Sequence, residues 1–396
     1  MEEGVRVDFL LTDEQRQIVA MVREFAREKV APYAAQWDAE ERFPVELVKE
    51  LASLGLLGLP IPEEYGGTGA DLLTRCLVVE ELARVDASVG LIVAVQDLGT
   101  TPIVLGGSEE LKRRYLPKLA QDGWLAAFGL TEPGAGSDPG GMEMRARRDG
   151  SSYILNGRKV FISHGSQAQV VCVFARTDPQ SAGPRGISAF VVEQGTPGFT
   201  AVPMKGKLGL RASDTAELIF EDCRVPAANR LGEEGEGFAL AMKTLDRSRA
   251  GIAAQALGIA QGAFDYALEY VQQRRQFGRP VAEFQGIQFM LADMATQIEA
   301  ARGLVYQAAR RVWEEGRGGA RLVTANRYSS MAKLFATDVA MRVTTDAVQL
   351  LGGYGVMRDY PVERMMRDAK VTQIYEGTNQ IQRVVIARSY LGGAKG

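Results

Sequence analysis

The stretch QIYEGTNQIQR, residues 373 to 383, holds a single carboxylate, Glu376, between an aromatic residue and a glycine. Two roles suit an acid at this position. A carboxylate at the start of a helix that begins near Thr378 would favour the positive end of the helix dipole, by about 0.3 to 1 kcal/mol. Alternatively, a carboxylate held away from water is a candidate general base. The residues of this stretch do not decide between the two roles.

The rest of the sequence excludes most other catalytic groups. His164 is the only histidine, so Ser-His and metal-histidine sites are nearly excluded and no metal site is expected. Gly134, Gly136 and Pro139 come close to the dinucleotide-binding pattern G-x-G-x-x-G, but no helical run follows them as in a nicotinamide-binding Rossmann unit. Acid-base chemistry would therefore fall to carboxylates. Redox chemistry would need a cofactor, since no side chain transfers a hydride.

Four further stretches are candidate ligand sites, and each also has a simpler structural interpretation. GLTEPGAGSDPGG (129 to 141) offers backbone N–H groups to a phosphate or a flavin edge, or is a turn after a strand. KVFISHGS (159 to 166) has an aromatic residue, Phe161, that is by default a core residue. RRQFGRPVAEFQGIQ (274 to 288) has several arginines near a helix break, which could bind an anion or could interact favourably with the C-terminal end of the helix dipole. LLGGYGVMRDYPVER (350 to 364) has glycines that admit a flat ligand, or is a C-cap and loop.

These stretches are carried by elements in the order α, then β, then α. Thr12 can form a capping box with Gln15, and helical periodicity continues over 44–57, 72–85 and 108–119. Short β-rich runs follow from about 124 to 232, with a hairpin turn predicted at Asn156 and Gly157. Long helical segments then cover 237–275, 283–315 and 320–351.

The predicted fold class is therefore mainly α with a central β domain. We expect an N-terminal helical domain over 1–123, an antiparallel β-barrel or sandwich over 124–234, and a C-terminal four-helix-type bundle over 235–396.

Composition and charge limit the kinds of partner. With 46% hydrophobic and 24% charged residues, the 396-residue chain has the usage of a globular protein. A net charge of -3 gives no field that would attract nucleic acid or anionic membranes. Cys76, Cys172 and Cys223 are odd in number and far apart, so we expect reduced thiols and a cytoplasmic location, or the mitochondrial matrix if a transit peptide was removed. The densest apolar run, VGLIVAV at 89 to 95, is shorter than the roughly 18 residues of a membrane span.

Taken together, FGLTEPGAGSD, KVFISHG, RRQFG with AEFQ, LLGGYG and IYEGTNQIQR resemble segments of the acyl-CoA dehydrogenase family. They occur in the family's order and at its approximate spacing, and the resemblance covers almost the whole chain. It implies a flavoenzyme that binds FAD and introduces an α,β double bond into acyl-CoA thioesters. The family's architecture agrees with the division into α, β and α regions.

The resemblance also implies which residues contact FAD. Residues 128 to 137 resemble the segment at the flavin and its phosphates, and residues 161 to 163 resemble the strand against the flavin ring, where the family most often has Trp-Ile-Thr. The arginine-rich and glycine-rich stretches resemble parts that reach the FAD of a neighbouring subunit, and the start of the last helix resembles an adenosine contact. The implied cofactor-binding residues are Phe128, Leu130, Thr131, Gly136, Ser137, Phe161, Ile162, Ser163, Arg274, Phe277, Gln285, Gln349, Gly352, Gly353, Thr378 and Gln380.

For catalysis, the resemblance implies that Glu376 removes the α-proton while flavin N5 receives the β-hydride. Burial against the acyl chain and the flavin would raise the pKa of this carboxyl toward neutrality and make it a better base. Some family members place the base just before the arginine that here is Arg249, but Ser248 stands there and cannot serve. The implied substrate-binding residues are Ser137, Asp246, Arg249, Tyr375 and Gly377.

The resemblance favours straight short- to medium-chain acyl-CoA, most like the short-chain and butyryl types. Members that act on glutaryl substrates carry an arginine where Gly90 stands, which disfavours a dicarboxylyl substrate. We expect trans-2-enoyl-CoA as product in fatty acid β-oxidation, an electron-transfer flavoprotein as electron acceptor, and a homotetramer arranged as a dimer of dimers. A branched-chain acyl-CoA dehydrogenase, an acyl-CoA oxidase and a non-catalytic acyl-CoA-binding homologue stay open as alternatives.

Overall fold

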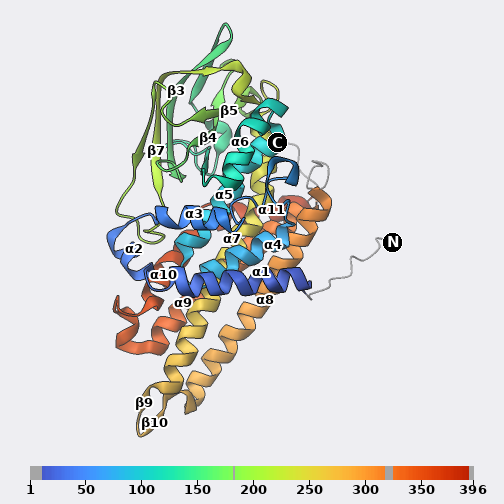
Figure 1. Ribbon diagram of the computed structural model, residues 1–396. Helices are drawn as coiled ribbons and strands as arrows, with labels where there is room; N and C mark the ends of the chain where they lie inside the picture. Colours follow the sequence, from blue (N-terminus) through green and yellow to red (C-terminus); the bar gives the residue numbers. More distant parts are fainter. Residues whose placement is uncertain (1–10, 182, 317–323, 392–396) are drawn as a thin grey trace. The chain divides into compact units, whose positions relative to one another are not determined.

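The computed structural model describes residues 11–181, 183–316 and 324–391, which Figure 1 traces along the chain. Contacts group the chain into two compact units. We call Met1–Ala35, Asp71–Gly90 and Arg249–Gly396 the helical unit, and Gln36–Ala70 and Leu91–Ser248 the sheet unit. The boundaries cut through helices α2 (Ala34–Glu40), α5 (Ala87–Gly106) and α7 (Gly237–Gln273). The division of the sequence into three domains stays a prediction.

The helical unit begins at the predicted capping box. The Thr12 hydroxyl accepts the N–H of Gln15 at 3.1 Å and the Gln15 side chain accepts the N–H of Thr12, so this prediction is confirmed. Helix α1 runs over Asp13–Phe25 and continues into a π-helical turn, Ala26–Val30. The remaining helices of the unit are α4 (Leu72–Ala83), most of α7, α8 (Gln285–Gly316), α9 (Thr324–Leu351), α10 (Pro361–Thr372) and α11 (Asn379–Tyr390).

Helix α9 connects most of this unit, because it packs against α8, α10 and α11; α8 and α9 lie side by side in Figure 1. Helix α7 approaches α4 so closely that a Cβ on Gly258 would lie 2.2 Å from the carbonyl oxygen of Glu80. The three long predicted helices are thus present as α7, α8 and α9. Residues 320–323 of the third predicted segment lie outside the described residues.

The sheet unit contains α3 (Val45–Ser53), α6 (Glu109–Gln121), most of α5 and an eight-stranded sheet. Helix α6 confirms the helical stretch predicted over 108–119, and Ser108 is its N-cap. The strands are β1 (Ala126–Gly129), β2 (Arg145–Asp149), β3 (Ser152–Ser163), β4 (Val170–Arg176), β5 (Ile187–Glu193), β6 (Phe199–Pro203), β7 (Thr215–Pro226) and β8 (Arg230–Leu231).

The β region was predicted as an antiparallel barrel or sandwich. The sheet is not closed into a barrel, and two of its strand pairs are parallel. The strand order is β6-β7-β3-β2-β4-β5-β8, an open path, with β1 pairing to β4. Strands β1 and β2 both run parallel to β4, while the other pairs are antiparallel. The sheet is therefore open and mixed. The sequence pattern predicts individual strands, but it does not show which strands distant in the sequence pair with one another.

The predicted hairpin turn at Asn156 and Gly157 is also wrong. Both residues lie within β3, at a register shift between β3 and β7, and Gly157 has a φ of 144°. The turn instead falls at Gly150 and Ser151, between the paired residues Asp149 and Ser152. A glycine is needed inside β3 because a Cβ at 157 would lie 2.8 Å from the Cα of Met144. Here the Asn-Gly pair marks a β-bulge.

The core of the sheet unit lies between one face of the sheet and helices α5 and α6. Cys172 and Phe174 of β4 and Ala189 of β5 pack there with Ile103 and Tyr115 of the helices.

Among the described residues, α5 is the one helix long and apolar enough to cross a membrane, and 78% of its most apolar window is buried, as in the core helix of a globular domain. Short 3-10 helices lie at Glu63–Tyr65, Pro139–Gly141, Gly183–Gly186, Ala227–Asn229, Val281–Glu283 and Gly352–Val356. Two short strands, β9 (Arg275–Gln276) and β10 (Arg279–Pro280), pair with each other.

Candidate functional site

Glu376 lies in the loop between α10 and α11, and its backbone is left-handed. Its φ is 56°, and the φ of Gly377 is 89°. A left-handed conformation costs a non-glycine residue about 1 to 2 kcal/mol, and such residues cluster at functional sites. Helix α11 begins after its N-cap, Thr378, whose hydroxyl accepts the N–H of Ile381 at 3.3 Å. Glu376 therefore precedes the N-cap by two residues and lies outside the first turn, which weakens the helix-dipole role.

Two buried side chains that sequence reasoning missed hold this loop. The carbonyl oxygen of Gly377 accepts hydrogen bonds from Lys333 Nζ at 2.8 Å and from Gln382 Nε2 at 3.0 Å. Gln382 Nε2 also donates to the carbonyl oxygen of Glu376 at 3.2 Å. A signal for Lys333 was present in the sequence, because it shares a face of α9 with small buried residues such as Ser329 and Ala336.

Tyr375 is anchored beside Glu376. Its hydroxyl donates to the side-chain oxygen of Gln255, whose amide in turn donates to the carbonyl of Ala87 at 2.7 Å. Burial raises the pKa of Tyr375 well above its usual range, and the neighbouring Glu376 carboxylate raises it further. Tyr375 therefore stays protonated and fixes one side of the loop to α7.

A cavity of about 510 Å³ brings together four of the residues predicted to contact FAD. Arg274, Gln349, Gly352 and Gly353 all line it, and the Arg274 guanidinium lies 5.4 Å from the ring centre of Tyr354. No atom lies within 4 Å of the position that a Cβ would take at Gly352 or Gly353, so the space beside these two residues is open. The cavity thus offers a cation, an aromatic face and a bare backbone to one ligand.

Four other residues of the helical unit that were predicted to contact FAD do not line that cavity: Thr378, the N-cap of α11, and Phe277, Gln285 and Gln380. Phe277 follows β9, has a φ of 53° and is 92% exposed, with its ring edge-on to Phe284. Gln285 is the first residue of α8, and Gln380 lies in the first turn of α11; both are exposed.

The predicted substrate residues of α7, Asp246 and Arg249, are three positions apart on one helix. Neighbours at this spacing lie on the same helix face. Arg249 is buried, and its Nη1 donates to the side-chain oxygen of Asn326 on α9. Ser248, between them, donates its hydroxyl to the carbonyl of Leu245 at 3.2 Å.

In the sheet unit, Phe161 was predicted by default to be a core residue, and this prediction is wrong. Its side chain is 67% exposed, its φ is 57°, and the register between β3 and β7 shifts between Lys159 and Ile162. Ile162 is buried and Ser163 partly buried, paired with Ala216 and Thr215 of β7. The bulge therefore turns an aromatic ring out of the sheet beside a hydroxyl, as a stacking surface requires.

The predicted flavin segment divides into a buried strand and an open loop. Phe128 packs its ring 4.9 Å from that of Phe174, and Leu130 is also buried, so only their backbone groups are available to a ligand. Thr131 accepts the N–H of Val160 with its carbonyl at 2.9 Å. Gly136 and Ser137 are exposed, and nothing lies within 4 Å of a Cβ at Gly136.

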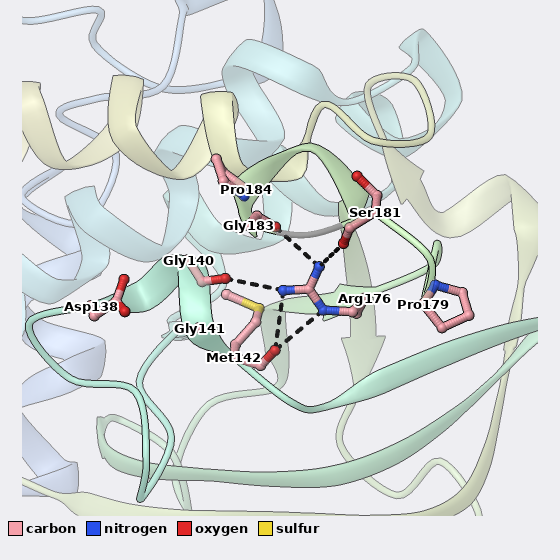
Figure 2. Close-up of a pocket in the computed structure, with 9 residues that line it drawn as sticks. All are labelled: Asp138, Gly140, Gly141, Met142, Arg176, Pro179, Ser181, Gly183 and Pro184. Carbon is pink, nitrogen blue, oxygen red and sulfur yellow. Dashed lines mark hydrogen bonds between the residues drawn. The ribbon is translucent and has the colours of Figure 1, made fainter. Parts of the chain in front are cut away.

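A second cavity of about 510 Å³ follows this loop, lined by Asp138, Gly140, Met142 and Arg176 among others. Figure 2 shows that the Arg176 guanidinium points to backbone carbonyls rather than into open space. It donates to Gly140 and Ser181 at 3.0 and 2.9 Å, and also to Met142 and Gly183. Arg176 therefore fixes the two loops that form the cavity wall.

Within residues 11–181, 183–316 and 324–391, no group of three or more His, Cys, Asp or Glu side chains is placed to hold a metal ion. The three cysteines are buried, and no disulfide joins them.

Comparison with known proteins places the whole chain in one family. The N-terminal, middle and C-terminal domain models of acyl-CoA dehydrogenase match residues 12–122, 127–223 and 235–391. The chain belongs to the acyl-CoA dehydrogenase family. It has the family's fold of an N-terminal helical domain, a middle β domain and a C-terminal helical domain.

Individual relatives agree with this assignment. An acyl-CoA dehydrogenase of Bacillus subtilis is 51% identical over 97% of this chain and 99% of its own. The solved butyryl-CoA dehydrogenase of Megasphaera elsdenii is 48% identical, with a TM-score of 0.92 over 97% of this chain and 100% of its own. A chain from the structure of the electron transferring flavoprotein of Acidaminococcus fermentans is 50% identical, with a TM-score of 0.93 over 97% of this chain and 99% of its own.

Acyl-CoA dehydrogenases are flavin-dependent oxidoreductases, and the residues of this chain fit a flavin. In the sheet unit, exposed Phe161 offers a face for the ring and the open backbone around Gly136 offers N–H groups. In the helical unit, the cavity at Arg274 and Gly353 suits an anionic, flat ligand.

Proposed function

We propose that the protein is an FAD-dependent acyl-CoA dehydrogenase that converts short- to medium-chain acyl-CoA to trans-2-enoyl-CoA with Glu376 as the base. The observation that carries this proposal is the left-handed backbone of Glu376 at the start of a tightly held loop outside helix α11. Such strain persists only when the surrounding structure imposes it. A helix-capping acid would not need it.

In this mechanism Glu376 takes the α-proton of the thioester, while bound FAD supplies the acceptor for the β-hydride. Gly377 lets the substrate come close to the base, and Tyr375, kept protonated by burial, holds the loop to α7 through Gln255. Arg249 and Asp246 on α7, with Ser137 of the sheet unit, would bind the CoA portion. Phe161, Ser163 and the backbone of residues 128–137 would hold the flavin ring, and Arg274, Gln349 and Gly353 another part of FAD.

The preference for short straight acyl chains is supported by the similarity to butyryl-CoA dehydrogenase. Gly90 supports the exclusion of a dicarboxylyl substrate, because a Cβ there would already lie 3.0 Å from Cβ of Ala83 on α4. A longer side chain such as arginine would have to displace that helix.

We also propose an electron-transfer flavoprotein as electron acceptor and a homotetramer as the assembly. The first is supported by the similarity to a chain from an electron transferring flavoprotein structure. The second is supported by large exposed apolar side chains on the helical unit, including Phe277, Phe289, Val384 and Tyr390.

Anaerobic titration of the flavin-loaded protein with acyl-CoAs of different chain lengths tests the proposal. Wild-type protein should bleach fastest with short chains, whereas Glu376→Gln should bleach at least ~100-fold more slowly while still binding acyl-CoA. Glu269→Gln, which changes an exposed acid of α7, is the control and should bleach at the wild-type rate. A near-normal rate for Glu376→Gln would refute the base assignment. Rapid reoxidation of the reduced protein by air would indicate an oxidase, and protein that retains no flavin would indicate a non-catalytic homologue.

A further inference from the structure

Lys333 is a buried lysine that the proposed mechanism has not used. It lies on α9 with none of its side chain exposed, on a face shared with Ser329 and Ala336. Its ammonium donates to the carbonyl oxygen of Gly377 at 2.8 Å and to Oδ1 of Asn379 at 3.0 Å. Burial of a lysine costs free energy unless it is well bonded, so a lysine at this position calls for a reason.

Gln382 bonds the same carbonyl of Gly377 and also that of Glu376. It is also fully buried, and its Nε2 donates to the carbonyls of Glu376 and Gly377 at 3.2 and 3.0 Å. The carbonyl of Gly377 therefore receives two hydrogen bonds from two helices, α9 and α11. Within the described residues, the Oε1 atom of Gln382 is buried without a hydrogen-bond partner, so the amide is oriented by these carbonyls alone.

The network extends from this pair to the helix ends. Asn379 Nδ2 donates to Asp338 Oδ1 at 2.7 Å, and the N–H of Asn379 donates to the carbonyl of Gln373 at 3.0 Å. Gln373 Nε2 also donates to Asp338 at 2.7 Å. The two ends of the loop are thus tied to each other and to α9, and the segment between them has little freedom.

We propose that Lys333, together with Gln382, is a positioning residue that holds the base Glu376 in its left-handed conformation and so aims its carboxylate at the substrate. The inference rests on the proposed function, because it assumes that Glu376 is the base. The hydrogen bonds to the carbonyls of Glu376 and Gly377 offset the cost of the left-handed backbone. A general base must lie within hydrogen-bonding reach of the proton that it removes, and a displacement of about 1 Å can cost ~100-fold in rate.

The charge of Lys333 adds a second effect on the same carboxylate. Burial lowers the pKa of Lys333 to about 7; Glu376 and Asp338 raise that pKa, and Arg249 lowers it. The ammonium form favours an ionised Glu376, and the amine form does not. The rate of proton removal should therefore change with pH near neutrality as Lys333 gains or loses its proton.

Exchange of the α-hydrogens of acetyl-CoA with D2O, followed by NMR on the flavin-loaded protein, tests this inference. Acetyl-CoA has α-hydrogens but no β-carbon, so exchange reports proton removal without dehydrogenation. In each cycle the α-C–H bond breaks, its proton passes to the Glu376 carboxylate and then to solvent, and a deuteron returns to carbon. Lys333→Met, which keeps the length of the side chain but removes its charge and N–H groups, should slow exchange at least ~10-fold. Affinity for acyl-CoA should change little, and the titration near pH 7 should disappear.

Further variants separate positioning from a merely structural role. Lys333→Gln, which retains a donor, should recover part of the exchange rate but not the titration. Gln382→Leu removes the other donor and tests the same hydrogen bonds if Lys333→Met does not fold. Lys370→Met is the matched control, because Lys370 is an exposed lysine near the same loop that bonds only to the side chain of Gln373 at 2.9 Å.

A readout that does not depend on flavin completes the test. Mass spectrometry should show faster amide hydrogen exchange in peptides covering residues 373–383 of Lys333→Met, with no change in Lys370→Met. Exchange of acetyl-CoA within twofold of wild type in Lys333→Met would overturn the inference. If Glu376→Gln also retained α-hydrogen exchange, the proposed function itself would fail, so the two failures are distinguishable.

Discussion

The ammonium of Lys159 lies 2.7 Å from Oε1 of Glu132, and both side chains are buried beneath the loop that follows β1. Lys159 Nζ also donates to the carbonyl of Leu130 at 3.1 Å. Glu132 in turn accepts the N–H groups of Glu143 and Met144 at 2.6 and 3.1 Å. One ion pair therefore joins strand β3 to both ends of the loop proposed to hold the flavin.

Removing one partner of this ion pair should destabilise the protein strongly. We expect Lys159→Met to lower the free energy of unfolding by about 3 to 5 kcal/mol, because it leaves the Glu132 charge buried and uncompensated. The same variant should lose flavin, since the loop is no longer held. Urea unfolding at pH 7 and the flavin absorbance retained after gel filtration measure the two effects.

The neighbouring surface pair provides the control for this prediction. Arg158 and Glu217 lie 3.6 Å apart with the arginine side chain largely exposed, so Arg158→Met should cost less than about 1 kcal/mol. The pH dependence supplies a further check. Burial lowers the pKa of Lys159 to about 8 from 10.5, so the unfolded state binds more protons between these values and the group makes stability rise with pH there. Equal losses in the Lys159 and Arg158 variants would contradict the ion-pair argument.

Phe161 should matter to the cofactor and not to the fold. Because its side chain is 67% exposed and its φ is positive, Phe161→Ala should change the free energy of unfolding of the flavin-free protein by less than about 1 kcal/mol. The same variant should bind FAD more weakly, since an aromatic face worth about 0.5 to 1.5 kcal/mol of stacking is lost. Fluorescence titration with FAD measures the affinity.

A buried aromatic of the same sheet distinguishes this result from general damage. Phe199 of β6 stacks on Phe220 of β7 at 4.8 Å, and Phe199→Ala should cost about 3 to 5 kcal/mol in stability. Phe161→Ala that loses stability to that extent, or that binds FAD as tightly as wild type, would show that the exposed ring is not a stacking surface.

Features set by neighbouring residues were predictable from the sequence. The capping box of Thr12 and Gln15 and the three long helices follow from local patterns. Glu376 could be singled out as an acid beside a glycine, and the left-handed backbone of both residues explains why that glycine is there. Each of these depends on residues within a few positions of one another.

Features set by distant residues were not predictable. Asn156 and Gly157 have the local signal of a hairpin, yet the approach of Met144 turns them into a bulge. Lys333 reaches a carbonyl 44 positions away, and Lys159 a carboxylate 27 positions away. The open, mixed sheet likewise depends on β1 and β2 pairing with β4. Local sequence does not encode which partners such side chains and strands meet in the folded chain.

His164 should make the protein less stable in acid. The ring is 1% exposed, its Nδ1 lies 3.2 Å from the carbonyl oxygen of Ala126, and the ring of Phe43 stands edge-on at 5.9 Å. Burial lowers the pKa of His164 from 6.5 to about 4, although the Ala126 carbonyl and Asp214 raise it in part. Between these two values the unfolded state binds a proton that the folded state does not, so the stability present above pH 6.5 is lost progressively as pH falls. The loss between pH 6.5 and 5 should be about 2 kcal/mol.

His164→Asn isolates this effect because the chain has one histidine. Asparagine does not titrate, its amide can donate to the Ala126 carbonyl, and it tolerates the left-handed φ of 59° at this position better than most residues. Urea unfolding of the two proteins at several values of pH should give curves that converge as pH falls, because carboxylate titrations are common to both. If the free energies of unfolding of the two proteins ran parallel between pH 6.5 and 5, the imidazole would be protonated in the folded protein. The interpretation of His164 as a buried, neutral histidine would then be wrong.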